Sequence, residues 1–358
     1  MSAARARGRR GSVVHEGLVG ARKLVGTPYL ASATLRNEYA RDIAPRTEAA
    51  LARILGEVYG PRGAPGAELA GNVVGEGSAG TGPRSVRETP PIRSLSPPTR
   101  AIDLGAGTGA VGRALRARFG ESLAVLAVDV VSEPGVLHAD LASELPAVHG
   151  RFDLVVAAHL LNELFVDRSP AERVELRARR VLEWSGALLA SGGAMVLVEP
   201  ALRGTSRELL AVRDQLLAAG LEVVAPCFWT GPCPALARER DWCHDAAPIA
   251  NGARVDYSYL VLRPADPQVA SAADPTLFRI VSDPMVEKGR LRLFGCGPAG
   301  RHPLVRLDRH HSPANAPFDA LYRGAVTRIS PTNVAGDGLR LTPDSVVRLV
   351  GRGPSERD

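Results

Sequence analysis

The chain has 358 residues, of which 45% are hydrophobic and 23% charged, and it carries a formal net charge of +6. This length provides for roughly two domains, and the composition is that of a folded chain rather than a disordered one. No apolar run approaches the roughly 18 residues that a membrane-spanning helix needs, so we expect no membrane partner.

Positive charge is concentrated toward the two ends of the sequence. Residues 1–62 hold 11 basic and 5 acidic side chains, and residues 285–358 hold 12 basic and 7 acidic ones. The two ends therefore carry net charges of +6 and +5, which leaves the middle of the chain with a net charge near −5. Basic flanks suit a polyanionic partner such as nucleic acid, and on charge alone a solvated surface suits them equally well. No apolar stretch follows Arg9-Arg10, so we expect no secretory signal and four reduced cysteines.

The order of predicted elements is that of an α/β protein. A basic arm and a helical lead-in occupy residues 1–59, with Pro45 as a break, and the Gly- and Pro-rich stretch 60–99 is typical of a linker. A domain of alternating strands and helices follows over residues 100–265. We expect about seven strands, the clearest at 100–104, 123–129, 153–158, 194–198, 221–225 and 257–262.

Two helix starts carry local signals. Ser169-Pro170-Ala171-Glu172 combines an N-cap serine, a proline at the first helical position and a glutamate that closes a capping box. We expect Gly192-Gly193 to end that helix, and a second helix to begin at Thr205 and stop at Gly220.

A glycine-rich loop follows the first strand of this domain. Asp103 precedes Gly105, Gly107 and Gly109, and a predicted helix at 109–119 follows directly. Glycine lets the backbone approach a ligand closely, and a helix start presents unpaired N–H donors. The loop suits either a dinucleotide or S-adenosylmethionine, because Gly112 also completes the dinucleotide spacing, and a glycine turn without ligand is the third alternative.

Acidic residues around the loop favour S-adenosylmethionine. Asp129 ends the next strand, where a carboxylate accepts hydrogen bonds from ribose hydroxyls, and Asp140 is placed to meet an exocyclic amine. The sequence therefore predicts a class I methyltransferase fold, with a Rossmann-like, mostly parallel sheet of seven strands. The predicted cofactor-binding residues are Asp103, Gly105, Gly107, Gly109, Asp129 and Asp140.

No residue is assigned a catalytic role from the sequence. Asn162 and Glu163 follow the strand at 153–158, and α/β sheets place active sites at the carboxyl ends of their strands. They are candidates for orienting a substrate and accepting a proton, and a capped helix start is the alternative reading of the same residues.

Four cysteines lie in the last third of the chain. Cys227, Cys233 and Cys243 share a Pro-rich insertion at 226–248, and Cys296 lies in a β-rich, basic extension at 266–358. Four thiolates in a reducing compartment suggest zinc or an iron-sulfur cluster, and spacing alone does not choose between the two metals. Four unrelated buried thiols are the alternative.

Together these motifs resemble a methyltransferase-like family that acts in small ribosomal subunit assembly in mitochondria and has bacterial relatives. The resemblance covers about residues 27–300. The cysteine motifs are its most specific part, namely Pro226-Cys227, Gly231-Pro232-Cys233-Pro234, Asp241-Trp242-Cys243-His244 and Gly295-Cys296-Gly297. Two further motifs, Leu161-Asn162-Glu163-Leu164 and Val198-Glu199-Pro200, lie upstream of these in the expected order.

The resemblance implies S-adenosylmethionine as cofactor, a 4Fe-4S cluster on the four cysteines, with zinc as the alternative, and contact with the small ribosomal subunit and its RNA. It implies that the protein is located in the cytoplasm, or in the mitochondrial matrix if the source is eukaryotic. Three functions stay open: a methyltransferase of the small subunit, a non-catalytic RNA-binding assembly factor on the same scaffold, and a zinc-stabilised methyltransferase of a small molecule or protein. The oligomeric state is not indicated.

Overall fold

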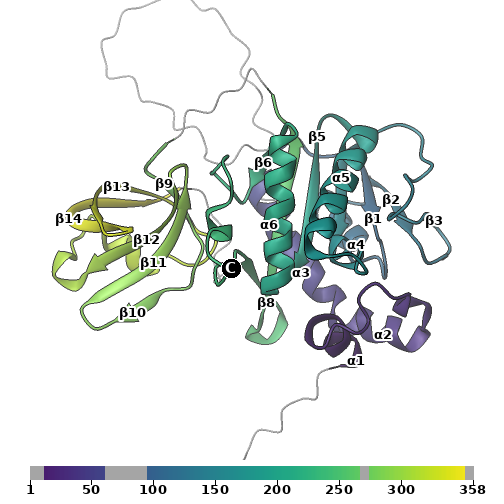
Figure 1. Ribbon diagram of the computed structural model, residues 1–358, viewed down its shortest axis with the longest axis horizontal. Helices are drawn as coiled ribbons and strands as arrows, with labels where there is room; N and C mark the ends of the chain where they lie inside the picture. The colour runs from purple at the N-terminus through teal and green to yellow at the C-terminus, as the bar shows by residue number, and fades with distance from the viewer. Residues whose placement is uncertain (1–11, 61–94, 267–273, 351–358) are drawn as a thin grey trace, which may run out of the picture. The chain divides into compact units, whose positions relative to one another are not determined.

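The structure is a computed structural model that describes residues 12–60, 95–266 and 274–350. It divides into two compact units, one of residues 1–52 and 98–271 and one of residues 53–97 and 272–358 (Figure 1). Most of the predicted linker at 60–99 lies outside the described residues. Among the described helices, none combines the length and the apolar character that crossing a lipid bilayer requires.

The first unit contains a sheet whose central path is β3-β2-β1-β4-β5-β8-β6. All neighbours on this path are parallel except β8, which runs antiparallel to both β5 and β6. This strand order, with one reversed strand inside the edge, confirms the predicted class I methyltransferase fold. The strands are β1 (Arg100–Leu104), β2 (Ala124–Asp129), β3 (Val136–His138), β4 (Phe152–Ala158), β5 (Leu189–Pro200), β6 (Leu221–Ala225) and β8 (Arg254–Pro264).

Two strands of this sheet were not predicted. β3 has three residues, which is too short for a periodic signal. β7 (Asp245–Pro248) comes from the cysteine insertion and pairs antiparallel with β8 off the central path. The sheet therefore has eight strands, one more than expected.

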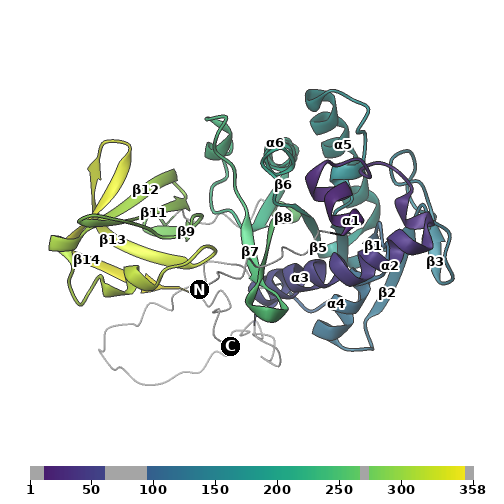
Figure 2. The ribbon, with the colours of Figure 1, turned by 90° about the horizontal axis from the view of Figure 1, so that it is seen from below.

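Helices cover both faces of the sheet. Figure 2 shows α5 (Pro170–Leu188) and α6 (Arg203–Ala218) on one side and α4 (Ala110–Phe119) with the first part of α3 (Ala44–Tyr59) on the other. Side chains of α5 and α6, such as Trp184 and Leu216, are fully buried against strand residues such as Val155 and Leu260. Burial of this apolar face is the main stabilising contribution to the unit.

The lead-in is helical, as predicted. It contains α1 (Val13–His15), a π-helical turn at Glu16–Gly20, a 3-10 turn at Tyr29–Ala31 and α2 (Ala33–Asp42). The chain turns at Ile43 and Pro45 lies in the first turn of α3, where a missing N–H costs no helical hydrogen bond. A cluster of buried side chains, including Val14, Tyr39 and Ala110, packs the lead-in onto α4.

The capping box at Ser169 is present, with the Glu172 carboxylate 2.9 Å from the Ser169 backbone nitrogen. The predicted end of that helix is wrong. α5 ends at Leu188, and Gly192-Gly193 lie inside β5, where a Cβ on Gly193 would come within 3.1 Å of the carbonyl oxygens of β4. These glycines permit an irregular strand pairing and do not cap a helix.

The second helix start is also wrong. α6 begins at Arg203 behind Leu202, which makes no side-chain cap, and Thr205 is buried within the first turn. Its end is confirmed, because the helix stops at Ala218 and Gly220 follows with φ +91°.

The second unit is a small closed barrel. Its strands follow the order β10-β11-β12-β14-β13-β9, and β11 also pairs with β9, which closes the ring. Phe278, Leu293, Leu304, Phe318 and Leu341 fill the interior. The strands are β9 (Leu277–Ile280), β10 (Met285–Glu287), β11 (Arg290–Gly297), β12 (Gly300–Leu307), β13 (Val326–Ala335) and β14 (Gly338–Leu349).

Candidate functional site

A cavity of about 350 Å³ lies in the first unit where β1, β2 and β4 end. We call it the cofactor cavity. The carboxyl ends of strands are where open α/β sheets bind ligands, and this volume lies within the range of small-molecule sites. Its lining includes the predicted Gly105, Gly107, Asp129, Asp140 and Glu163.

The glycine loop forms one wall of the cofactor cavity because its backbone is left-handed. Gly105, Gly107 and Gly109 have φ of +77°, +52° and +78°. A Cβ on Gly105 would also stand 3.1 Å from the Leu160 side chain, and one on Gly107 would stand 3.2 Å from Leu30. Both features require glycine. Gly109 caps α4 and is not among the lining residues.

The three predicted acids occupy different places. Asp129 lines the cavity, and its carboxylate accepts hydrogen bonds from the backbone nitrogens of Gly107 at 2.8 Å and Val131 at 2.9 Å. Asp140 lines it too, and accepts from the Ser143 hydroxyl at 2.7 Å. Asp103 is buried and is not among the lining residues, and burial together with the charge of Asp129 raises its pKa to about 8.

A second cavity, of about 280 Å³, adjoins the first. The two share Tyr29, Tyr39, His159 and Glu163 as lining residues. The far side of the second cavity includes Arg46, Asn162, Pro200, Arg254, Asp256 and Tyr257. The shared residues form a wall that faces both spaces, and we call it the shared wall.

Glu163 is the acid of the shared wall. Its Oε1 accepts a hydrogen bond from the Tyr29 hydroxyl at 3.1 Å. Burial raises the pKa of Glu163 to about 7, although the hydrogen bond from Tyr29 acts in the opposite direction. A carboxyl group with this pKa exchanges a proton near neutral pH.

His159 is the second polar group of the shared wall. It directly follows β4 and has φ +59°, an uncommon conformation for a residue with a side chain. Its Nε2 lies 3.1 Å from the Thr47 hydroxyl, whereas its Nδ1 is buried without a hydrogen-bond partner. Burial lowers the pKa of His159 to about 4, so the ring is neutral at pH 7.

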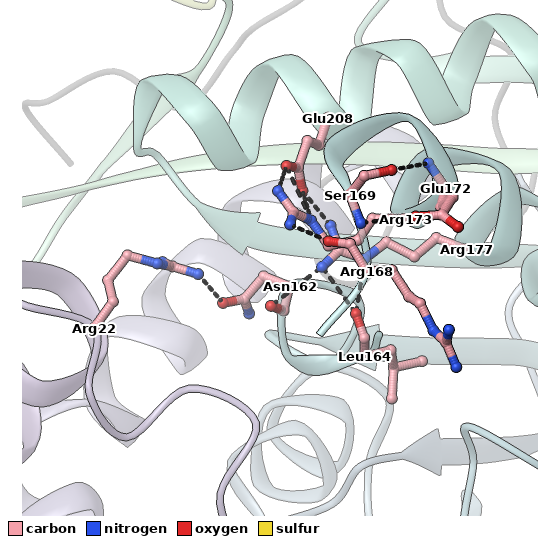
Figure 3. Close-up of polar contacts among 9 residues, drawn as sticks. All are labelled: Arg22, Asn162, Leu164, Arg168, Ser169, Glu172, Arg173, Arg177 and Glu208. Carbon is pink, nitrogen blue, oxygen red and sulfur yellow. Dashed lines mark hydrogen bonds and ion pairs between the residues drawn. The ribbon is translucent and has the colours of Figure 1, made fainter. Parts of the chain in front are cut away.

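Asn162 holds the chain that follows β4 (Figure 3). Its side-chain oxygen accepts from Arg22 at 3.1 Å, and its side-chain nitrogen donates to the His159 carbonyl at 2.8 Å. Arg177 donates to the carbonyls of Asn162 and Leu164 and pairs with Glu208 of α6. Asn162 is therefore engaged in positioning the shared wall.

Sequence reasoning missed Tyr29, Tyr39 and His159. The tyrosines belong to the lead-in, which has no sequence link to the sheet, and only the packing of the folded unit brings them to the glycine loop. The one sequence signal for His159 is its position directly after the buried run of β4.

The three cysteines of the insertion lie on one connection of the first unit. Cys227 follows β6, Cys233 caps the short 3-10 helix at Pro234–Leu236, and Cys243 precedes β7. Cys296 lies in β11 of the second unit. The part of the chain that the structure describes contains no group of three or more Cys, His, Asp or Glu side chains gathered as a metal site. The four-cysteine site therefore stays a prediction.

Side chains of α6 hold the cysteine connection. Asp214 accepts from the Cys233 backbone nitrogen at 2.9 Å, and Arg207 donates to the carbonyls of Ala235 at 3.0 Å and Arg238 at 2.8 Å. Arg213 is fully buried and donates to the Gly231 carbonyl at 3.0 Å.

The thiols of Cys227 and Cys233 lie near each other and near Arg213. Burial and the charge of Cys227 raise the pKa of Cys233 to about 11. Burial alone would lower the pKa of Arg213, but Cys227, Asp214 and Cys233 raise it. The charge of Arg213 acts to lower the pKa of Cys233, but burial and Cys227 outweigh it.

The family model described as mitochondrial small ribosomal subunit Rsm22 matches residues 94–303, more than half of the chain. The chain belongs to this family. The match includes the glycine loop, the shared-wall residues His159 and Glu163, and all four cysteines, and it ends within β12. A search of curated proteins gave no match.

Solved structures with a similar fold are methyltransferases. A proposed RNA methyltransferase from Pyrococcus horikoshii is 13% identical over 49% of this chain and 77% of its own, with a TM-score of 0.29. The N-methyltransferase NodS from Bradyrhizobium japonicum, solved with S-adenosyl-L-homocysteine, is 14% identical over 48% of this chain and 80% of its own, also with a TM-score of 0.29.

Replacing Asn162 with alanine should loosen the chain after β4. Asn162→Ala removes two side-chain hydrogen bonds in a buried setting, so we expect the free energy of unfolding to fall by about 1–3 kcal/mol. Urea unfolding measures this change. The matched control is Arg168→Ala, whose side chain is 56% exposed and is expected to change stability by less than about 0.5 kcal/mol. Equal stability of the two variants would contradict the positioning role.

Proposed function

We propose that this protein is an S-adenosylmethionine-dependent methyltransferase that acts on the small ribosomal subunit. The observation that carries the proposal is the pair of adjoining cavities, one walled by the glycine loop and both facing Glu163. Membership of a small ribosomal subunit family supports the choice of partner. The basic flanks of the sequence suit contact with ribosomal RNA.

The residues of the cofactor cavity fit S-adenosylmethionine. The left-handed backbone at Gly105 and Gly107 leaves room for the methionine part, and the Asp129 carboxylate at the end of β2 suits ribose hydroxyls. Asp140 lies on the same cavity and suits the adenine amine. Asp103, next to the loop in the sequence, is buried and does not line the cavity. The cofactor supplies a methyl group on a positively charged sulfur.

The second cavity is where we place the methyl acceptor. A nucleophilic atom of the acceptor uses its lone pair to form the new bond to the methyl carbon, and the electron pair of the broken carbon–sulfur bond stays on the sulfur. An N–H or O–H acceptor then loses a proton, and Glu163 is the group of the shared wall with a pKa suited to receive it. The tyrosines and the neutral His159 exclude water and orient the acceptor.

The glycine loop gives a direct test of cofactor binding. Gly105→Ala puts a Cβ against Leu160 at a left-handed position, so we expect affinity for S-adenosylmethionine to fall at least tenfold in isothermal titration calorimetry. Gly135→Ala is the control, because Gly135 also has positive φ, +77°, but has no neighbour within 4 Å and does not line the cavity. Equal affinity of both variants would remove the loop from the cofactor site.

Glu163 gives a test of catalysis. With radiolabelled S-adenosylmethionine and purified small subunits, the initial rate should rise with pH through about 7, because only the carboxylate form accepts a proton. Glu163→Gln should lower the rate about 10²-fold and abolish this pH dependence, whereas exposed Glu175→Gln should change neither. No label transfer by the unaltered protein would sink the methyltransferase claim and leave a binding factor.

We further propose that Cys227, Cys233, Cys243 and Cys296 hold a 4Fe-4S cluster, with zinc as the rival metal. The support is the four-thiol donor set of the family motif and the buried Arg213 beside Cys227 and Cys233, whose charge offsets that of thiolates. The cluster would supply folding free energy and not a step of methyl transfer.

Anaerobic purification should give a brown protein with iron and sulfide in near-equal amounts. Cys233→Ser should lose most of the iron and lower the melting temperature, because binding energy at a structural metal site is folding energy. An Arg-to-Lys change at exposed Arg179 serves as the control. Stoichiometric zinc in place of iron would refute the cluster and leave the fold unaffected.

A further inference from the structure

The barrel of the second unit has the strand connectivity of an oligonucleotide-binding fold. Taken in chain order without the short β10, its five strands close in the order first, second, third, fifth, fourth and back to the first. Only the pairing of β12 with β14, the third and fifth strands, is parallel. This is the five-stranded Greek-key barrel whose second and third strands, with two flanking loops, bind oligonucleotides or oligosaccharides.

A fold alone does not assign a ligand, whereas the side chains on the outer face of β11 and β12 do bear on which ligand fits. Leu291 and Leu293 of β11 point into the core, which leaves Arg292, Phe294 and Cys296 on the outside. Cross-strand pairing sets Val305, Pro303 and Arg301 of β12 directly opposite these three. We call five of these positions, all except the proposed cluster ligand Cys296, the barrel face.

The barrel face combines an aromatic ring with cationic side chains. The Arg301 guanidinium carbon lies 4.7 Å from the centre of the partly buried Phe294 ring, within the range of a cation–π contact. Arg340 of β14 is exposed and pairs with Val305, which extends the cationic row across the barrel. Within β11 and β12, both fully described, no outward position is acidic. Glu287 of β10 contacts Arg290 and Arg292 and is the acid nearest to this row.

Two exposed valines lie on connections of the barrel but on the other side of the strands from the barrel face, because Val286 pairs with the inward Leu291 and Val334 pairs with Leu339. Val286 is 83% exposed on β10, between the first and second barrel strands, and Val334 is 81% exposed beside the turn between the last two. These connections correspond to the two loops that grip ligands in such barrels. The two valines therefore add nothing to the stacking surface at Phe294.

Charge over the whole barrel favours an anionic ligand. Residues 274–350 hold 11 basic and 7 acidic side chains, a net of +4. Three of the acids, Asp274, Asp283 and Asp319, are paired with Arg328, Arg323 and Arg306, none of which belongs to the barrel face. An anionic strand with stackable bases matches this surface better than a neutral sugar polymer does.

We propose that the barrel face binds single-stranded RNA, with bases stacked at Phe294 and phosphates beside Arg292 and Arg340. The choice of RNA rests on the proposed function, whereas the site itself rests on the barrel. Double-stranded RNA presents its bases to one another and not to a stacking ring, so it should bind this face more weakly.

The test uses anaerobically purified full-length protein and a fluorescent 12-nucleotide oligouridylate, with fluorescence anisotropy at two salt concentrations. We expect salt-sensitive binding that Arg340→Glu weakens at least tenfold and that Phe294→Ala weakens about five- to hundredfold, the range for one stacked base. The control is Arg348→Glu, the same charge change on β14 opposite Arg328 of β13 and off the barrel face. It should weaken binding less than threefold.

The outcomes separate this inference from the proposed function. Equal weakening by Arg340→Glu and Arg348→Glu, absence of oligouridylate binding, or tighter binding of a duplex would each overturn the barrel face as a single-strand site. Calorimetric binding of S-adenosylmethionine by the same variants should be unchanged. RNA binding without methyl transfer would refute the proposed reaction and leave the barrel face as an RNA site. Methyl transfer without oligouridylate binding would refute the barrel face as an RNA site and leave the proposed reaction standing.

Discussion

The guanidinium of Arg177 is buried, and an unpaired charge in such a place costs several kcal/mol, so the surrounding elements have to supply acceptors. Glu208 of α6 supplies a carboxylate, and the chain after β4 supplies the carbonyls of Asn162 and Leu164. The charge thus joins two helices to the stretch that carries His159 and Glu163. Because both cavities use this stretch as a wall, their shape depends on the pairing of a residue that lines neither of them.

The lead-in completes the site from the other side. Arg22 bonds to Asn162, and Tyr29 bonds to Glu163, so two side chains from the first thirty residues fix the same short stretch. Arg22, His159 and Phe165 are the non-glycine residues with positive φ in the described chain. Such conformations cost of order 1–3 kcal/mol each and persist only where neighbours impose them. His159 and Phe165 line the cofactor cavity and Arg22 bonds to Asn162, so all three of these conformations belong to the walls of the site or to the contacts that hold them.

The features that could be predicted from the sequence are those set by residues close together in the chain. The strand, glycine loop and helix around Gly105 are set by neighbours in the chain, as are the capping box at Ser169 and the acid that ends β2. Long-range packing accounts for what was missed. Nothing near Tyr39 in the sequence points to the glycine loop, and nothing in the sequence of β11 says that it pairs with β9 to close a barrel. Gly192-Gly193 shows the same limit, since the pair suits a helix end but lies inside β5, where Gly193 permits a close approach to β4.

Two titratable groups on the shared wall are moved in opposite directions by the same cause. Burial disfavours charge, so it lowers the pKa of His159 to about 4 and raises that of Glu163 to about 7. At pH 7 the imidazole is therefore neutral, whereas the Glu163 carboxyl group titrates near that pH. A proton leaving an acceptor would therefore go to Glu163, and the partnerless Nδ1 of His159 is left to hold the acceptor through a hydrogen bond. In the proposed reaction, burial would therefore divide the roles of base and anchor between two residues four positions apart.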